Sequence, residues 1–139
     1  MKTVLTSFAT LGACHAARWY LDRSSRKPAE TAGGHLRLTA LWNKGAAFGL
    51  PIRKEGLLVL SGAVLSAVWL LRGRSPFGAG LALGGGVSNL LERLRHGKVY
   101  DYVQFPKAPG KLKRYVFNLA DLAIFAGGLL MAAGKHGNG

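Results

Sequence analysis

Uninterrupted apolar runs alternate with polar, basic segments along the chain, and the longest charge-free run in its first half covers residues 56–71. Lys54 and Glu55 precede this run, and Arg72 and Arg74 follow it. At 1.5 Å per residue the run covers about 24 Å of a roughly 30 Å hydrocarbon core, and the basic flanks can extend to the membrane interface. The pattern predicts a membrane helix with interfacial ends.

Two further runs have the same character. Residues 76–91 are uncharged and open with Pro76, which suits the first turn of a helix. Gly80 and residues 84–86 would weaken a helix in water, but in lipid they permit close packing between helices. Residues 115–134 form the third run, which is long enough to span and contains one acid.

The amino-terminal stretch, residues 4–21, is apolar but interrupted by His15 and Arg18. Its start also resembles a secretory signal, and residues 11–14 resemble a lipobox with Cys14 as the modified residue. The apolar core before Cys14 is short, however, and the chain stays hydrophobic beyond it. These features favour a helix that is retained in the protein.

The polar segments between these runs are too rich in glycine and charge to span a membrane. In the first of them Leu36 and Leu38 alternate with Arg37 and Thr39, which predicts a short strand. Because one helix pair separates the two polar connections, both are expected on the same side of the membrane. The sequence thus predicts a single integral membrane domain, residues 1–139, of all-α class with four transmembrane helices. Their expected bounds are 3–21, 56–73, 76–94 and 115–134, with a loop at 95–114.

Composition supports a membrane partner. The chain is 49% hydrophobic and has a net charge of +13, from 19 basic and 6 acidic residues. The basic residues gather at 18–27, 37–54 and 93–114, and the segments between them are apolar. A soluble nucleic-acid binder would instead show amphipathic elements with one charged face. We therefore expect contacts with anionic membrane lipids and no nucleic acid.

Metal and disulfide chemistry find little support in the sequence. Cys14 is the single cysteine, so neither an intramolecular disulfide nor a multi-cysteine metal site is possible. The four histidines are scattered and lack the spacing of metal ligands. No metal and no cofactor are expected.

The acid within the last apolar run is the most informative residue for function. An ionised carboxylate at Asp121, about two turns into the expected helix, costs on the order of 3 kcal/mol on insertion scales. Asn118 lies three residues earlier, so the two side chains should share a helix face and the amide can orient the carboxyl group. On the preceding helix Asn89, Glu92 and Arg93 form a second polar face at the same membrane end.

Asp101 follows that preceding helix closely, and a short return segment could bring it to Asp121. Two carboxyl groups at hydrogen-bonding distance in a low dielectric share one proton. Such a pair supplies a base for water and an acid for a leaving amine, as in peptide hydrolysis. The alternative is that Asp121 forms a packing ion pair with Arg93 or Arg95.

Three motifs resemble those of the lipoprotein signal peptidases, the signal peptidase II family. Residues 43–49, NKGAAFG, are similar to the family's N-x-G-A-A-F motif. Residues 85–101, GGVSNLLERLRHGKVYD, resemble G-G-x-x-G-N-x-x-D-R followed by V-x-D-[FY], and residues 117–121, FNLAD, match F-N-x-A-D. Their order, spacing and placement at helix ends also agree with the family.

The resemblance implies four membrane helices, a small β-rich platform at residues 35–53 between the first two, and a catalytic pair formed by Asp101 and Asp121. It further implies an aspartyl endopeptidase in the bacterial cytoplasmic (inner) membrane, with its site near the outer face. We expect the protein to be a monomer. Such an enzyme removes signal peptides from diacylglyceryl-modified prolipoproteins and cleaves before the lipidated cysteine. By the same match, the substrate site would contain Asn43, Gly45, Asn89, Arg93, Asn118 and Ala120.

Several positions depart from the family pattern. Glu92 stands where the family has Asp, Ser88 replaces a glycine and Leu122 replaces a serine. Residues 14–18, CHAAR, align with the family's D-Q-x-[ST]-K and lack its acid. These departures indicate a divergent member. They leave open an alternative function, a non-catalytic protein on the same scaffold that binds lipidated peptides or lipid.

The distribution of basic residues conflicts with the orientation that the resemblance implies. The two connections assigned to the outer side hold most of the lysines and arginines. The positive-inside rule favours the opposite orientation.

Overall fold

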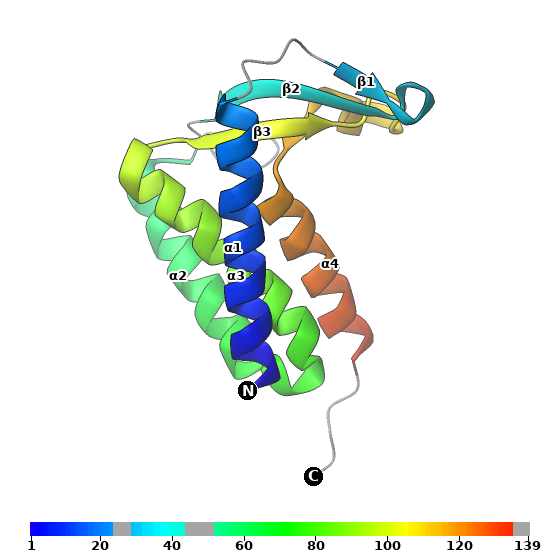
Figure 1. Ribbon diagram of the computed structural model, residues 1–139. Helices are drawn as coiled ribbons and strands as arrows, with labels where there is room; N and C mark the ends of the chain where they lie inside the picture. The colour runs from blue at the N-terminus through cyan, green and yellow to red at the C-terminus, as the bar shows by residue number, and fades with distance from the viewer. Residues whose placement is uncertain (24–28, 44–51, 135–139) are drawn as a thin grey trace.

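Four α-helices form a bundle, and a four-stranded antiparallel sheet lies across one end of it in the computed structural model, which describes residues 1–23, 29–43 and 52–134 (Figure 1). The helices are α1 (Lys2–Arg23), α2 (Lys54–Leu70), α3 (Pro76–His96) and α4 (Leu119–Ala133). The strands are β1 (Ala29–Thr31), β2 (Leu36–Asn43), β3 (Val99–Gln104) and β4 (Val116–Phe117). The 3-10 helices are η1 (Ala32–Gly34), η3 (Arg72–Arg74) and η4 (Gly110–Arg114).

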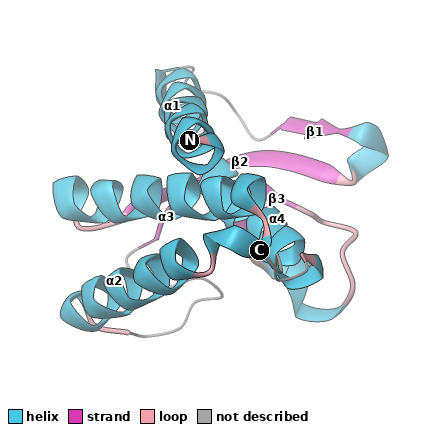
Figure 2. Ribbon diagram, turned by 90° about the horizontal axis from the view of Figure 1, so that it is seen from below, coloured by secondary structure: helices cyan, strands magenta, loops and turns pink. Residues whose placement is uncertain are grey.

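Helix α3 is central and packs against the other three helices (Figure 2). Its glycines permit this close packing. A Cβ at Gly84 would lie 2.6 Å from the Ser7 carbonyl oxygen of α1, and a Cβ at Gly85 would lie 2.5 Å from the Ala120 carbonyl oxygen of α4. The prediction that this glycine-rich run mediates helix packing is confirmed.

The ends of α3 follow local sequence signals. Ser75 caps its start by accepting a hydrogen bond from the Gly78 N–H at 3.1 Å, and Pro76 occupies the first turn. Gly97 ends the helix with φ 69°, a left-handed conformation that glycine adopts without steric cost. This reversal leads the chain directly into β3, which carries Asp101.

The sheet order is β1-β2-β3-β4, and every neighbouring pair is antiparallel. In the β2–β3 pairing Trp42 lies opposite Tyr100, and in the β3–β4 pairing Val103 lies opposite Phe117. The second pairing ties β3 to the segment that immediately precedes α4. Tyr100, Tyr102 and Val103 form a buried cluster where the sheet meets the bundle.

The strand predicted around Leu36 and Leu38 is confirmed as part of β2. The prediction of a mainly helical protein with a small sheet is confirmed. The confinement of that sheet to a platform at 35–53 is wrong. β3 comes from the expected loop at 95–114, and β4 occupies the expected start of the last helix. The reason is backbone pairing with β2, which draws these residues into one sheet. None of the helices in the described ranges combines the length and apolar content needed to cross a membrane.

Candidate active site

Asp121 lies in the first turn of α4, and Asn118 is the N-cap of that helix. The two residues cap each other. Asn118 Oδ1 accepts a hydrogen bond from the Asp121 N–H at 2.8 Å, and Asp121 Oδ2 accepts one from the Asn118 N–H at 3.0 Å. The expected position of Asp121, two turns into a helix that includes Asn118, is wrong because α4 begins only at Leu119. The helix N-terminus favours a negative charge on Asp121.

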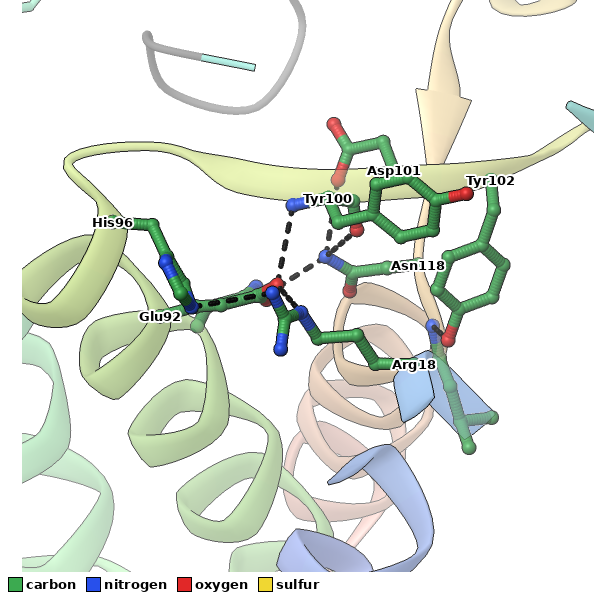
Figure 3. Close-up of polar contacts among 9 residues, drawn as sticks. Arg18, Glu92, His96, Tyr100, Asp101, Tyr102 and Asn118 are labelled. Atoms are coloured by element: carbon green, nitrogen blue, oxygen red, sulfur yellow. Dashed lines mark hydrogen bonds and ion pairs between the residues drawn. The ribbon is translucent and has the colours of Figure 1, made fainter. Parts of the chain in front are cut away.

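Asp101 is buried in β3, with 3% of its surface exposed. Its Oδ1 accepts a hydrogen bond from Asn118 Nδ2 at 3.0 Å (Figure 3). Its Oδ2 accepts one from Asn43 Nδ2 at 3.2 Å. Asn118 therefore contacts both carboxyl groups, Asp101 through its side chain and Asp121 through its backbone. A strand and a helix from distant parts of the chain meet at this residue.

Asn89 of α3 makes a second connection between the two acids. Its Nδ2 donates to Asp121 Oδ1 at 2.9 Å, and its Oδ1 accepts from Asn118 Nδ2 at 2.9 Å. The two asparagine amides thus hold the carboxyl groups in fixed orientations.

Burial and the neighbouring charge of Asp121 raise the pKa of Asp101 to about 7. Burial is the larger cause because it removes water from the ionised form. The hydrogen bonds from Asn43 and Asn118 oppose the rise. Asp101 can therefore carry a proton near neutral pH, where an ordinary aspartate is ionised.

An apolar groove of about 330 Å³ lies between α2 and the α3–α4 pair. Ser61 of α2 contributes to its polar lining. The other polar lining residues, Asn89, Arg93 and Asp121, lie toward the sheet end of α3 and α4. The apolar side chains that line it include Leu57, Leu60, Val64, Leu65, Val68 and Ile124. The groove therefore extends from the apolar side chains of the helices to the Asp121 carboxyl group.

The remaining residues expected at the site have different positions. Arg93 lines the groove, as noted, and Ala120 is buried against α3, with its carbonyl facing Gly85. Gly45 lies outside the described residues, together with the rest of its motif after Asn43. Among the described residues, no group of three or more His, Cys, Asp or Glu side chains is placed to hold a metal ion.

Two contacts near the site were not predicted. The Tyr102 hydroxyl accepts a hydrogen bond from the Leu119 N–H at 2.9 Å, and burial raises the pKa of this hydroxyl to about 12. Arg18 of α1 forms an ion pair with Glu92 of α3. The interruption of an apolar stretch by Arg18 was the available signal, since a base in an apolar helix needs an acidic partner.

Comparison with known proteins identifies the family. Residues 7–135 match the sequence model of signal peptidase (SPase) II. The lipoprotein signal peptidase of Pelotomaculum thermopropionicum is 42% identical over 103 residues, covering 68% of this chain and 64% of the relative. That of Nitrobacter hamburgensis is 39% identical, covering 65% and 62%, and that of Moorella thermoacetica is 35% identical, covering 85% and 86%. The chain spans less than two thirds of the length of the first two relatives.

Two solved structures of bacterial membrane enzymes share the fold. Their TM-scores are 0.81 and 0.77, each at 17% sequence identity and over 94% of this chain, with 85% and 90% of the solved chains covered. The sheet across one end of a helical bundle is therefore a known arrangement. Because the sequence model covers nearly the whole chain, the protein belongs to the signal peptidase II family.

Proposed function

We propose that the protein is a membrane aspartyl endopeptidase that removes signal peptides from diacylglyceryl-modified prolipoproteins and cleaves before the lipidated cysteine. The observation that carries this proposal is the hydrogen bonding of both Asp101 and Asp121 to one residue, Asn118. Membership of the signal peptidase II family supports the same reaction. The catalytic groups are the two carboxyls.

One proton is shared between the two carboxyls during catalysis. Asp101, whose pKa is about 7, starts as the acid, and Asp121, which accepts hydrogen bonds at a helix N-terminus, starts as the base. Asp121 takes a proton from water as the water oxygen bonds to the scissile carbonyl carbon. Asp101 gives its proton to the carbonyl oxygen. When the C–N bond breaks, Asp121 gives its proton to the leaving amine nitrogen. Asp101 takes a proton from one hydroxyl of the gem-diol as the carbonyl of the new carboxylic acid forms, so the pair again holds one proton.

The groove supplies the lipid site in this proposal. Its lining is apolar, and its polar end contains Asp121, Asn89 and Arg93. A diacylglyceryl chain in the groove would place the peptide bond next to the modified cysteine at the carboxyl groups. Asn43, Asn118 and Ala120, with Gly45 by the motif match, are assigned to the surrounding substrate site.

The helices present apolar side chains to their surroundings. Exposed examples on three of them are Leu5, Phe8, Val59, Val64, Phe125 and Leu129. The signal peptidase II family consists of bacterial membrane enzymes. We infer a single domain, residues 1–139, whose four helices span the cytoplasmic membrane as a monomer, with the sheet and the site near the outer face.

Cleavage of a synthetic prolipopeptide by the purified full chain in detergent tests the proposal. Three reactions are compared: the diacylglyceryl-modified peptide, the same peptide with an unmodified cysteine, and the modified peptide with EDTA. We expect cleavage before the lipidated cysteine with and without EDTA, and little cleavage of the unmodified peptide. Binding of the lipopeptide without any cleavage would instead establish the non-catalytic alternative.

A further inference from the structure

Arg18 connects α1 to two other elements beside the site. Figure 3 shows its contacts with Glu92 and His96 of α3. Its guanidinium forms the ion pair with Glu92 of α3, and Arg18 Nη2 lies 3.2 Å from His96 Nε2. The guanidinium carbon also lies 5.6 Å from the centre of the Trp42 ring of β2. Such contacts hold a long side chain in one conformation, which isolated surface ion pairs rarely do.

Glu92 extends this connection to β3. Its Oε1, which contacts Arg18, also accepts a hydrogen bond from the Tyr100 N–H at 3.4 Å. Tyr100 directly precedes Asp101 in the chain, and Trp42 directly precedes Asn43. Tyr100 and Trp42 are paired in the sheet register, with their ring centres 5.1 Å apart.

Asn43 and Asp101 form one hydrogen bond of the site. Glu92 contacts Tyr100, the residue before Asp101, and Arg18 contacts Trp42, the residue before Asn43. The ion pair therefore acts next to both partners of that hydrogen bond. Glu92 exposes 11% of its side chain and Arg18 28%, so the pair is partly shielded from water. A shielded acid that loses its partner either takes up a proton or moves toward water. Either response would loosen the Tyr100 contact and displace the start of β3.

We propose that Arg18 and Glu92 are positioning residues for peptide cleavage, which set the place of Asp101 relative to Asn118 and Asp121 by tying β3 to α1 and α3. The inference rests on the proposed protease function. The two side chains act on the aspartates indirectly, Glu92 through Tyr100 and Arg18 through Trp42. A displacement of reacting groups by about 1 Å can cost on the order of a hundredfold in rate.

Steady-state cleavage of the diacylglyceryl-modified peptide by variants of the full chain tests this inference. Arg18→Met and Glu92→Gln each remove one charge, and Arg18→Lys keeps the charge. Arg95→Met is the matched control, because Arg95 is an exposed base on the same end of α3. Thermal melting in detergent is recorded for every variant.

We expect Arg18→Met and Glu92→Gln to lower kcat by about ten- to a hundredfold with KM changed less than about threefold. Arg18→Lys should recover most of the loss, and Arg95→Met should stay within about twofold of the parent. The double variant should be no slower than the slower single variant, because both substitutions break one interaction.

Parent-like kcat in Arg18→Met and Glu92→Gln would overturn the positioning role. So would a rise in KM at constant kcat, or a kcat loss that matches the loss of folded protein. If Arg18→Met does not fold, the kcat of Glu92→Gln and Arg18→Lys decides. Absence of cleavage by the parent chain would instead reject the protease function itself, so the two failures are distinguishable.

Discussion

The side-chain nitrogen Nδ2 of Asn118 lies 3.0 Å from Asp101 Oδ1. The residue that caps α4 therefore also binds the carboxyl group of Asp101 on β3. The same amide contacts Asn89, and the Asn118 backbone contacts Asp121. One side chain therefore combines a folding role with a site role. The two roles can be separated by substitution.

Asn118→Ser retains a good helix N-cap but cannot reach Asp101 in the same way. We expect this variant to melt close to the parent and to lose about a hundredfold in kcat. Asn118→Ala loses the cap as well, which should cost about 1 kcal/mol of stability. Melting curves and cleavage rates measured side by side check both expectations. An equal drop in melting temperature in the two variants would mean that the side-chain cap does not contribute to stability.

The raised pKa of Asp101 predicts a pH limit on activity. As pH rises through about 7, Asp101 loses the proton that the reaction needs, so kcat/KM should fall on the alkaline side. The fall should follow a single titration. A kcat/KM that stays flat up to about pH 9 would show that Asp101 is not the acid.

The same shift affects stability. The pKa of Asp101 is higher in the folded protein than its ordinary value of 3.8, so its stabilising contribution is complete below pH 3.8 and is lost as pH rises through about 7. The parent chain should therefore melt at a lower temperature at pH 8 than at pH 5. Asp101→Asn should reduce this difference. An unchanged difference in the variant would assign the pH dependence to other groups.

Gly85 fixes the distance between α3 and α4 next to the site. A Cβ there would lie 2.5 Å from the Ala120 carbonyl oxygen, so Gly85→Ala must push α4 and Asp121 away from Asn89. We expect a destabilisation of about 1–3 kcal/mol and a marked loss of cleavage. Gly128 is the matched control, because a Cβ there meets nothing within 4 Å. Similar results for Gly85→Ala and Gly128→Ala would contradict the close approach.

The groove makes a separate prediction about lipid. Val59 and Val64 are both exposed on α2, but of the two Val64 alone lines the groove. Val64→Trp should fill part of the groove and raise KM for the diacylglyceryl-modified peptide by about tenfold, with little change in kcat. Val59→Trp should behave like the parent. A KM effect of equal size in both variants would remove the groove as the acyl site.

Much of the fold could be predicted because its signals are local. The apolar runs, Pro76 and the glycines of α3 give the helices and their packing, and the alternation around Leu36 gives β2. The strands β3 and β4 could not be predicted in the same way. Their pairing depends on residues far away in the chain, and Val116–Phe117 is too short to show a pattern.

The site was predictable in its residue types and less so in its geometry. An acid in an apolar run indicated Asp121, and the motif match indicated Asp101 and the asparagines. The helix start at Leu119 was missed, so the role of Asn118 as a cap and bridge was missed with it. Glu92 was predicted as part of a polar helix face and as a departure from the family pattern. Its contacts with Arg18 and Tyr100 were not predicted, because they join three separate elements.

The proposed reaction requires Asp101 and Asp121 to act as one proton-sharing pair. Cleavage of the diacylglyceryl-modified peptide by Asp101→Asn, Asp121→Asn and the double variant tests it most directly, with Glu55→Gln on α2 as an acid-to-amide control. Each single variant should lose at least about a thousandfold in kcat, and the double variant should be no worse than either. Full activity in Asp101→Asn or Asp121→Asn, in protein that melts like the parent, would contradict the pair.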